Sequence, residues 1–243
     1  METKLKLEYE IAKEDKSGLP VIIVAAGNST RMQGINKQFL EIKGVPVIAR
    51  TLLAFENSSD ISRIILVVRD EDVYSFQILS EKYNISKLSD IVCGGKTRAE
   101  SVLKGFGRLS EDEEKVLIHD GARPFVSEKI ISSVAGALEK YSAVTCAVKV
   151  KDTVKQVDKS GKIIKTLDRN FLNAVQTPQG VKIKEYLGAA KNLKDVKDFT
   201  DDTSIMEAAG YSCYCVEGSY KNIKITTPED ILVAEGFLTE ENS

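Results

Sequence analysis

Short apolar runs that alternate with helical stretches are the feature of this sequence that most constrains its fold. The run VIIVAA at 21–26 is continuous and apolar, as is most of the run RIILVV at 63–68. Runs of this kind are typical of strands buried on both faces of a sheet. The segments 45–57 and 71–83, which follow these runs, have helical character. The chain therefore begins as strand, helix, strand and helix.

Later segments continue this order. Strands are expected at 90–95, 115–124 and 143–150, and helices at 98–109 and 127–141, the last with Ser127 as its N-cap. Alternation of this kind predicts an α/β fold: a Rossmann-like, mostly parallel sheet with helices on both faces. Ligands of such sheets bind at the carboxyl ends of the strands.

Residues 150–170 interrupt the alternation. Apolar and polar residues alternate around a DKSG turn at 158–161, which predicts a β-hairpin. Its polarity suggests an arm that projects from the sheet and pairs with a second subunit, as exposed strand edges often do.

The segments after the arm return to the earlier pattern. They begin with AVQTPQG at 174–180, to which no element is assigned, and are then expected to form helices at 182–192 and 202–209, strands at 211–217 and 223–226, and a last helix at 228–238 that starts with Thr227, Pro228 and Asp230. The predicted division of the chain is an N-terminal extension at 1–18, a single domain at 19–238 with the arm at about 150–173, and a tail at 239–243.

Composition narrows the class of protein. A net charge of -2 over 243 residues argues against a protein dominated by nucleic-acid binding. Four cysteines without a C-x-x-C pair, and one histidine, make a zinc site improbable and fit a reducing cytoplasm. Cys213 and Cys215 are interpreted as small apolar fillers on one face of a strand. The charged N-terminus is no signal peptide, and no apolar run reaches the length of a membrane span, so a cytoplasmic protein without membrane contact is expected.

The loop after the first strand carries the first candidate site. Ala25, Ala26 and Gly27 have almost no side chain, so backbone N–H groups there can approach a phosphate closely. Arg31 and Lys37 follow as charge-assisted donors. Alone, A-A-G would indicate an ordinary surface loop. The sequence does not match the dinucleotide fingerprint G-x-G-x-x-G, and GGKT at 94–97 lacks the first glycine of a P-loop.

Two further strand ends carry candidate residues. Gly95 ends one strand, and Arg98 and Ser101 open the next helix, whose N-terminus suits a base or a phosphate. Asp120 suits a Mg²⁺ contact or a ribose hydrogen bond, and Arg123 suits a second phosphate. His119, beside Asp120, is interpreted as a packing or hydrogen-bonding residue rather than a catalytic one.

Taken together and in order, these motifs resemble the 2-C-methyl-D-erythritol 4-phosphate cytidylyltransferase family. The resemblance covers about residues 20–238 and rests on A-A-G-N-S-T-R-M, K-Q-F-L, G-G-x-x-R-x-x-S-V, H-D-G-A-R-P, K-D-T-V-K, D-R-N, T-P-Q, T-D-D-x-S and N-I-K-I-T-T-P-E-D. It implies a transferase that moves CMP from CTP to a sugar-alcohol phosphate with Mg²⁺ or another divalent cation. It also implies a homodimer whose arm reaches the partner's active site.

The resemblance assigns roles to matching positions. Arg31 and Lys37 stabilise charge on the α-phosphate, and Arg169 and Lys224 hold the attacking phosphate, so these four are the expected catalytic residues. The positions expected to hold CTP are Ala25, Ala26, Gly27, Gly95, Arg98, Ser101 and Asp120, the last also as the metal contact. The positions expected to bind the acceptor are Arg123, Thr153, Arg169, Thr200 and Lys224.

Three departures and two rival functions accompany the resemblance. Asn28, Ser29 and Gly121 replace other small residues, and Lys96 replaces an acidic residue found in some relatives, which puts one cytidine contact in doubt. A ribitol-5-phosphate cytidylyltransferase would share the fold and the CTP loop. A non-catalytic nucleotide-binding protein would keep the fold but release no pyrophosphate.

Overall fold

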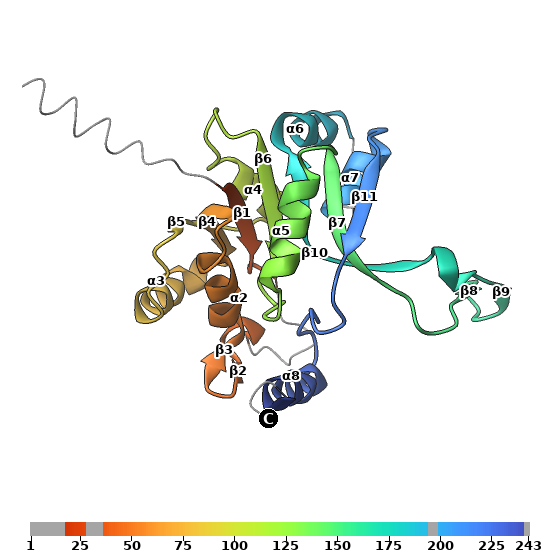
Figure 1. The fold of residues 1–243 in the computed structure, drawn as a ribbon, viewed down its shortest axis with the longest axis horizontal. Coiled ribbons are helices and arrows are strands. Elements are labelled where there is room, and N and C mark those ends of the chain that lie inside the picture. The colour runs from red at the N-terminus through yellow and green to blue at the C-terminus, as the bar shows by residue number, and fades with distance from the viewer. Residues whose placement is uncertain (1–17, 28–35, 194–198, 241–243) are drawn as a thin grey trace, which may run out of the picture.

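A central seven-stranded sheet organises the chain, seen here in a computed structural model that describes residues 18–27, 36–193 and 199–240 (Figure 1). Its strands run in the spatial order β11-β7-β10-β6-β1-β4-β5. Their bounds are β1 Leu19–Val24, β4 Ile61–Val68, β5 Leu88–Cys93, β6 Lys115–Asp120, β7 Ala143–Lys149, β10 Asn173–Lys182 and β11 Cys213–Glu217. All described pairings are parallel except those of β10, which is antiparallel to both β6 and β7.

Helices cover both faces of this sheet, as the alternation predicts. One face packs against α2 (Val47–Glu56), α3 (Val73–Lys82) and α5 (Glu128–Ala137). The other packs against α4 (Arg98–Phe106), α6 (Ile183–Asn192) and α7 (Asp202–Ala208). The α/β fold class expected from the sequence is confirmed.

The two cores follow from the alternation of side chains along each strand. On β1, Val21 and Ile23 join the α2–α3–α5 core, whereas Ile22 joins the α4–α6–α7 core. All three are fully buried. With apolar residues on both faces, β1 is an interior strand of the sheet, and its carboxyl end lies where ligands of such sheets bind.

A small layer beside the sheet is built from β2 (Glu41–Ile42), β3 (Val45–Pro46) and α8 (Pro228–Glu240). Ile42, Val47, Ile225 and Ala234 form its buried core. The last helix begins at Pro228, as expected, and the Asp230 carboxylate accepts the backbone N–H of Thr227 at 2.8 Å.

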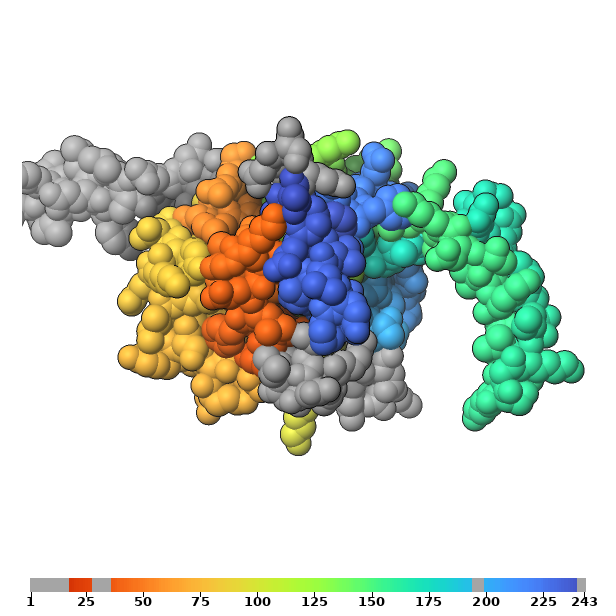
Figure 2. Space-filling view, turned by 90° about the horizontal axis from the view of Figure 1, so that it is seen from below, coloured from red at the N-terminus to blue at the C-terminus, as the bar shows by residue number. Residues whose placement is uncertain are grey.

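The arm predicted from 150–170 is present as a two-stranded hairpin, β8 (Lys155–Val157) and β9 (Ile163–Thr166). Gly161 takes a φ of 86° in the turn, a conformation that favours glycine. The hairpin projects from the body of the molecule, and Figure 2 shows it standing clear of the remaining surface. Four apolar side chains of the arm at 150–173 are exposed: Val157, Ile163 and Ile164 in the hairpin, and Phe171 after it.

Two expectations need correction, and one segment without an assigned element is a strand. Residues 223–226 form no strand; this segment pairs with a loop instead, with Ile225 N–H donating to the Ala122 carbonyl at 2.8 Å. Residues 174–180, for which no element is predicted, belong to strand β10 inside the sheet. Cys215 is exposed, so the interpretation as a packing residue is wrong there; all four cysteines are free.

Ser127 occupies the N-cap position of α5 as expected, but its side chain makes no capping hydrogen bond. Among the described residues, no helix is both long enough and apolar enough to cross a membrane.

Candidate active site

A cavity of about 430 Å³ lies at the carboxyl ends of the central strands. Backbone hydrogen bonds extend the sheet to its rim: Ala25 N–H donates to Val67 at 2.7 Å, and Gly121 N–H donates to Val24 at 2.9 Å. The cavity is lined by residues 24, 26 and 27 of the first loop, 37 and 38, 69–71, 94–98 and 101, 120 and 122, and 224. Segments far apart in the sequence thus meet where an α/β sheet binds ligands.

Small residues form the floor of this cavity because two loops approach closely. A Cβ added to Gly94 would lie 2.4 Å from the Ala26 Cβ, a distance that packed carbon atoms do not adopt. A Cβ on Gly121 would lie 2.9 Å from the Ile48 side chain and 3.2 Å from the Ala25 Cβ. These side-chain-poor positions are therefore required by packing as well as by access to a ligand.

The start of α4 is already hydrogen-bonded within the chain. Gly95 N–H donates to the Ser101 hydroxyl at 3.0 Å, and Lys96 N–H donates to the Glu100 carboxylate at 2.8 Å. The Thr97 hydroxyl caps the helix by accepting Glu100 N–H at 3.1 Å. These three N–H groups are occupied, so the loop's contribution to a ligand comes from its shape and its remaining polar groups.

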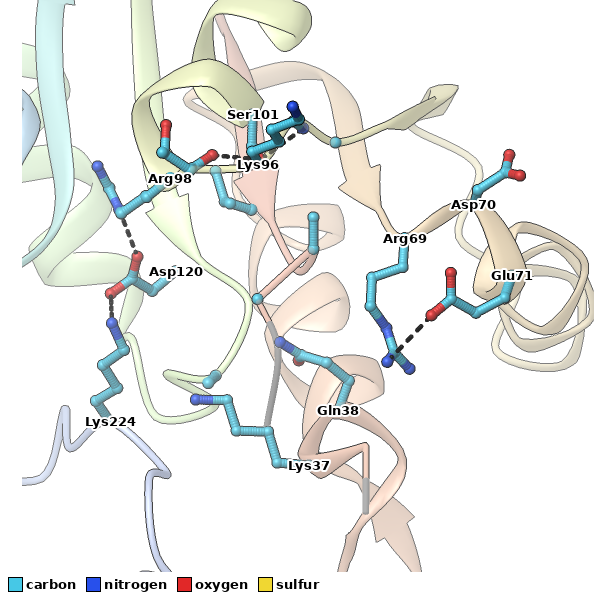
Figure 3. A pocket seen from close by; sticks show the side chains of 17 residues that line it. Lys37, Gln38, Arg69, Asp70, Glu71, Lys96, Arg98, Ser101, Asp120 and Lys224 are labelled. Carbon is cyan, nitrogen blue, oxygen red and sulfur yellow. Dashed lines mark hydrogen bonds and ion pairs between the residues drawn. The ribbon is translucent and has the colours of Figure 1, made fainter. Parts of the chain in front are cut away.

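Asp120 is the electrostatic centre of the site. Its carboxylate lies 2.7 Å from Lys224 Nζ, 3.2 Å from Arg98 Nε and 3.8 Å from Arg123 Nε. Figure 3 shows Arg98 and Lys224 approaching it from opposite sides, with Lys37 extending towards the same space. Burial opposes ionisation, but Arg98 and Lys224 outweigh it and hold the pKa of Asp120 well below its usual range. Asp120 is therefore an anion that orients cations around it.

A second hollow, of about 310 Å³, adjoins the first. It shares Arg98, Asp120 and Lys224 with the first cavity and adds Arg123 and Thr200, among others. Two separate ligands can therefore be placed on either side of one cluster of cations. This is the arrangement needed to bring two anions together.

Arg123 is more deeply embedded than a phosphate-binding arginine at a surface. Its Nη1 donates to the Asn222 carbonyl at 2.8 Å, and burial lowers its pKa. It therefore acts first as a link between the β6 end and the segment that carries Lys224.

His119 packs beneath the site rather than opening into it. Its ring is fully buried and meets Phe55 edge-on, with ring centroids 4.8 Å apart. Nε2 lies 3.2 Å from the Arg123 carbonyl, an acceptor, so Nε2 carries the proton. Nδ1 then accepts from the Thr177 hydroxyl at 3.1 Å, and that hydroxyl in turn accepts Asp120 N–H at 3.0 Å. Burial lowers the pKa of His119 to about 3, which keeps it neutral.

The structure brings together most of the residues expected in the site. Those that line one or both hollows are Ala26, Gly27, Lys37, Gly95, Arg98, Ser101, Asp120, Arg123, Thr200 and Lys224. Ala25 lies beneath the rim, 1 % exposed, and lines neither hollow. Arg31 lies outside the described residues.

Thr153 and Arg169 do not lie with these site residues. Both are exposed on the arm, where Arg169 Nη1 donates to the Lys151 carbonyl at 2.5 Å. Neither residue lines the two hollows of its own chain.

Several buried polar residues around the site were not assigned from the sequence. Gln179 accepts Asp202 N–H at 2.8 Å and donates to Asp201 at 2.8 Å. Asn222 donates to the Thr177 carbonyl at 2.9 Å. The motifs T-P-Q, T-D-D and N-I-K contain these residues, but only packing shows that their side chains are turned inwards.

The described residues contain no cluster of three or more histidine, cysteine, aspartate or glutamate side chains that could enclose a metal ion. Asp120 offers one ionised carboxylate whose oxygens each have a further lone pair. That fits the mode in which Mg²⁺ takes one or two carboxylates and completes its shell with substrate phosphates.

An α/β sheet with a double, cation-rich hollow at its carboxyl edge defines a protein that binds phosphorylated ligands. Comparison with known proteins narrows this class. The family model for 2-C-methyl-D-erythritol 4-phosphate cytidylyltransferase matches residues 19–240, and the chain belongs to this family.

Curated relatives and solved structures agree. The chain is 47% identical over 220 residues to the 2-C-methyl-D-erythritol 4-phosphate cytidylyltransferase of Clostridium novyi (strain NT), covering 89% of this chain and 95% of that one. It is 46% identical to that of Bacillus mycoides (strain KBAB4), covering 90% and 96%. The crystal structure of 4-diphosphocytidyl-2C-methyl-D-erythritol synthase from Anaerococcus prevotii DSM 20548 superposes with a TM-score of 0.80 at 35% identity, covering 93% of this chain and all of that one (100%).

Proposed function

We propose that this chain transfers CMP from CTP to 2-C-methyl-D-erythritol 4-phosphate, which gives 4-diphosphocytidyl-2-C-methyl-D-erythritol and pyrophosphate in the non-mevalonate route to isoprenoid precursors. The observation that carries the proposal is the pair of hollows joined by Arg98, Asp120 and Lys224. Family membership over 19–240 identifies the chain as a nucleotidyltransferase and favours this acceptor over ribitol 5-phosphate.

The reaction needs no protein nucleophile, because the acceptor's phosphate is already an anion at neutral pH. An oxygen of that phosphate attacks the α-phosphorus of CTP in line. The new P–O bond forms as the bond to the β-phosphate bridging oxygen breaks, and pyrophosphate leaves with the electron pair. The protein positions two polyanions and stabilises the charge of the transition state.

The chain's own residues divide this work. The loop at Ala26 and Gly27, with Gly95 and Ser101, shapes the nucleotide hollow. Lys37 faces the same hollow and would act on the α-phosphate, together with Arg31. Lys224, held at 2.7 Å by ionised Asp120, would meet the acceptor's phosphate at the boundary between the hollows.

Mg²⁺ or another divalent cation is proposed as the cofactor. When bound, it would neutralise phosphate charge and polarise the α-phosphorus. Asp120 is the carboxylate that would hold it, with phosphate oxygens supplying further ligands.

A homodimer joined through the arm is proposed for the assembly. Two features support it: Val157, Ile163, Ile164 and Phe171 expose apolar surface on the arm, and Arg169 lines neither hollow of its own chain. In a dimer, Thr153 and Arg169 of one chain would complete the acceptor hollow of the other. Four free cysteines support a reducing, cytoplasmic setting.

The test is pyrophosphate release from the purified protein with CTP and Mg²⁺, with 2-C-methyl-D-erythritol 4-phosphate and ribitol 5-phosphate assayed side by side. Release with the first acceptor alone is expected. Release with ribitol 5-phosphate alone would reassign the acceptor hollow, and CTP binding without release would favour the non-catalytic nucleotide-binding protein.

A further inference from the structure

We propose that Asp202, a buried carboxylate at the start of α7, is a positioning residue of the transfer site: it fixes the guanidinium of Arg98 and, through it, the carboxylate of Asp120. The inference rests on the proposed function for its kinetic consequence, but its structural part can be tested without turnover.

Asp202 is held from three elements at once. Its side chain is fully buried, and Oδ1 accepts the Tyr186 hydroxyl of α6 at 3.0 Å. Its backbone N–H donates to Gln179 of β10 at 2.8 Å. Its Oδ2 lies 2.7 Å from Nη2 of Arg98 at the start of α4. Asp202 is thus held by its backbone and by one partner at each carboxylate oxygen, so it is a fixed reference point rather than a mobile ligand.

Arg98 transmits this rigidity into the site. Its guanidinium joins two carboxylates, Asp202 through Nη2 at 2.7 Å and Asp120 through Nε at 3.2 Å. The guanidinium is a planar fork, so fixing one edge of it also fixes the other. Burial opposes the charge of Arg98, but Asp202 and Asp120 outweigh burial and raise its pKa. Arg98 is thus a permanently charged bridge.

The charge balance explains why Asp202 matters to Asp120. Arg98 is shared between the carboxylates of Asp202 and Asp120, and the closer contact of Asp120 is with Lys224 at 2.7 Å. Without the charge of Asp202, Arg98 would turn fully towards Asp120 and compete with Lys224 for it. Lys224, which faces both hollows, would lose its orientation.

Asp202 also connects the two halves of the site along the chain. Thr200 and Asp201 precede it directly and line the acceptor hollow. Gln179 binds both Asp201 and the backbone of Asp202, so the acceptor hollow and the Arg98 bridge share one support. A defect at Asp202 should therefore lower turnover, rather than weaken the binding of one substrate alone.

A purely structural role is the competing explanation, because a buried ion pair also affects folding. The two explanations are separated by comparing Asp202→Asn with Tyr186→Phe. Both variants remove an interaction of the same buried carboxylate, but only Asp202→Asn alters the bridge to Arg98. We expect Asp202→Asn to lower kcat by about 10- to 100-fold, with a smaller change in either KM. Tyr186→Phe should keep kcat within about 3-fold of the wild-type value, even if its Tm falls by as much as that of Asp202→Asn.

A double-mutant cycle with Arg98→Lys extends the test. Lysine keeps the positive charge but cannot span two carboxylates. The kcat of the double variant should therefore be close to that of the poorer single variant, not the product of the two losses. Should Asp202→Asn not fold, Arg98→Lys alone carries the test, and wild-type kcat in that variant would overturn the proposal.

The structural part is read from the ¹⁵N–¹H signal of Arg98 Nε, assigned by its loss in Arg98→Lys. We expect it to be sharp in the wild type and in Tyr186→Phe, and shifted or broadened in Asp202→Asn. An unchanged signal in Asp202→Asn would overturn the proposal whatever the activity. The proposal would also be overturned if Asp202→Asn and Tyr186→Phe lost kcat equally and in proportion to their losses in Tm. An inactive wild type whose Arg98 signal behaves as expected would instead contradict the proposed function.

Discussion

Cationic side chains around the carboxylate of Asp120 set the electrostatics of this site. Arg98, Arg123 and Lys224 lie within 4 Å of Asp120, whose single negative charge balances only part of theirs and leaves the cluster positive for a phosphorylated ligand. Lys37 lines the nucleotide hollow and extends towards the same space in Figure 3. We expect its positive charge to stabilise the transition state at the α-phosphate.

Replacing Lys37 with alanine should lower kcat by about 100- to 1000-fold, the usual effect of losing one preorganised donor to developing charge. The measurement is steady-state pyrophosphate release at saturating CTP and acceptor. Lys129→Ala is the control, because Lys129 is exposed on α5 and its replacement removes the same positive charge away from the site. Wild-type turnover in Lys37→Ala would exclude Lys37 from the mechanism.

His119 has its effect on stability rather than on chemistry. Its pKa is lowered by burial from 6.5 to about 3, so between these values the unfolded chain binds a proton that the native state does not. Stability contributed by neutral His119 is therefore complete above pH 6.5 and is lost as the pH falls. A one-proton difference corresponds to about 1.4 kcal/mol per pH unit.

We expect His119→Gln to remove this slope. The free energy of urea unfolding, measured between pH 6 and pH 4, should fall less steeply in the variant than in the wild type, by about 1.4 kcal/mol per pH unit. His119 is the chain's single histidine, so no other imidazole contributes. Parallel pH dependences in the two proteins would show that His119 titrates normally in the native state.

At the scale of elements, the close approach of two strand ends shapes the nucleotide hollow. Gly94 follows β5 and Ala26 follows β1, and the Ala26 Cβ lies too close to Gly94 to leave room for a side chain there. Gly94 N–H also continues the sheet by donating to Val68 at 2.7 Å. The floor of the site is thus part of the sheet's own hydrogen bonding.

Gly94→Ala should destabilise the protein by about 1–3 kcal/mol through overpacking and should raise the KM for CTP. The matched control is Gly188→Ala, because Gly188 lies inside α6 with nothing within 4 Å of an added Cβ. That control should gain about 0.5–1 kcal/mol from helix propensity. Thermal unfolding and CTP titrations measure both; equal Tm values for Gly94→Ala and the wild type would show that the loops separate freely.

At the scale of the whole molecule, the arm is the feature that suggests pairing with a second copy of the chain. A hairpin of two short strands with exposed apolar residues gains little stability by itself. Pairing with a second copy would bury that surface. It would also bring Arg169 to an acceptor hollow that lacks it in the single chain.

This assembly predicts complementation between two impaired variants, measured at an acceptor concentration well below the KM of Arg169→Ala. Lys37→Ala should have almost no turnover at the site that contains the substitution. Arg169→Ala should raise the KM for the acceptor phosphate more than the KM for CTP. After co-refolding, a mixed dimer would contain one site built from the intact core of one chain and the intact arm of the other. Random pairing at equal amounts should restore about a quarter of wild-type activity.

The control for complementation is each variant refolded alone by the same procedure. Activity no higher than the average of the two variants would place Arg169 in its own chain's site or outside the reaction.

Much of this picture could be predicted from the sequence. Apolar runs such as 21–26 predicted the buried strands, because a strand covered on both faces needs apolar side chains on both. The arm was predicted from its alternating polarity and its DKSG turn. The motifs at strand ends predicted the position of the site, since carboxyl ends of parallel strands meet at one edge.

Other features depended on the tertiary structure. The central antiparallel strand β10 was not predicted, because its TPQG segment carries turn residues and only its neighbours β6 and β7 make it a strand. Residues 223–226 look like a strand by local propensity but pair with a loop instead.

The α/β class, the arm and the set of cations available to the site follow from the amino-acid sequence, because local periodicity and residue chemistry do not depend on distant contacts. Which charges meet depends instead on how the chain packs. Asp202 and Asp120 are 82 positions apart in the numbering, yet Arg98 bridges them. Such pairing is set by how α4, α6 and α7 pack on one face of the sheet, where burial leaves each polar group only the partners that the packing provides.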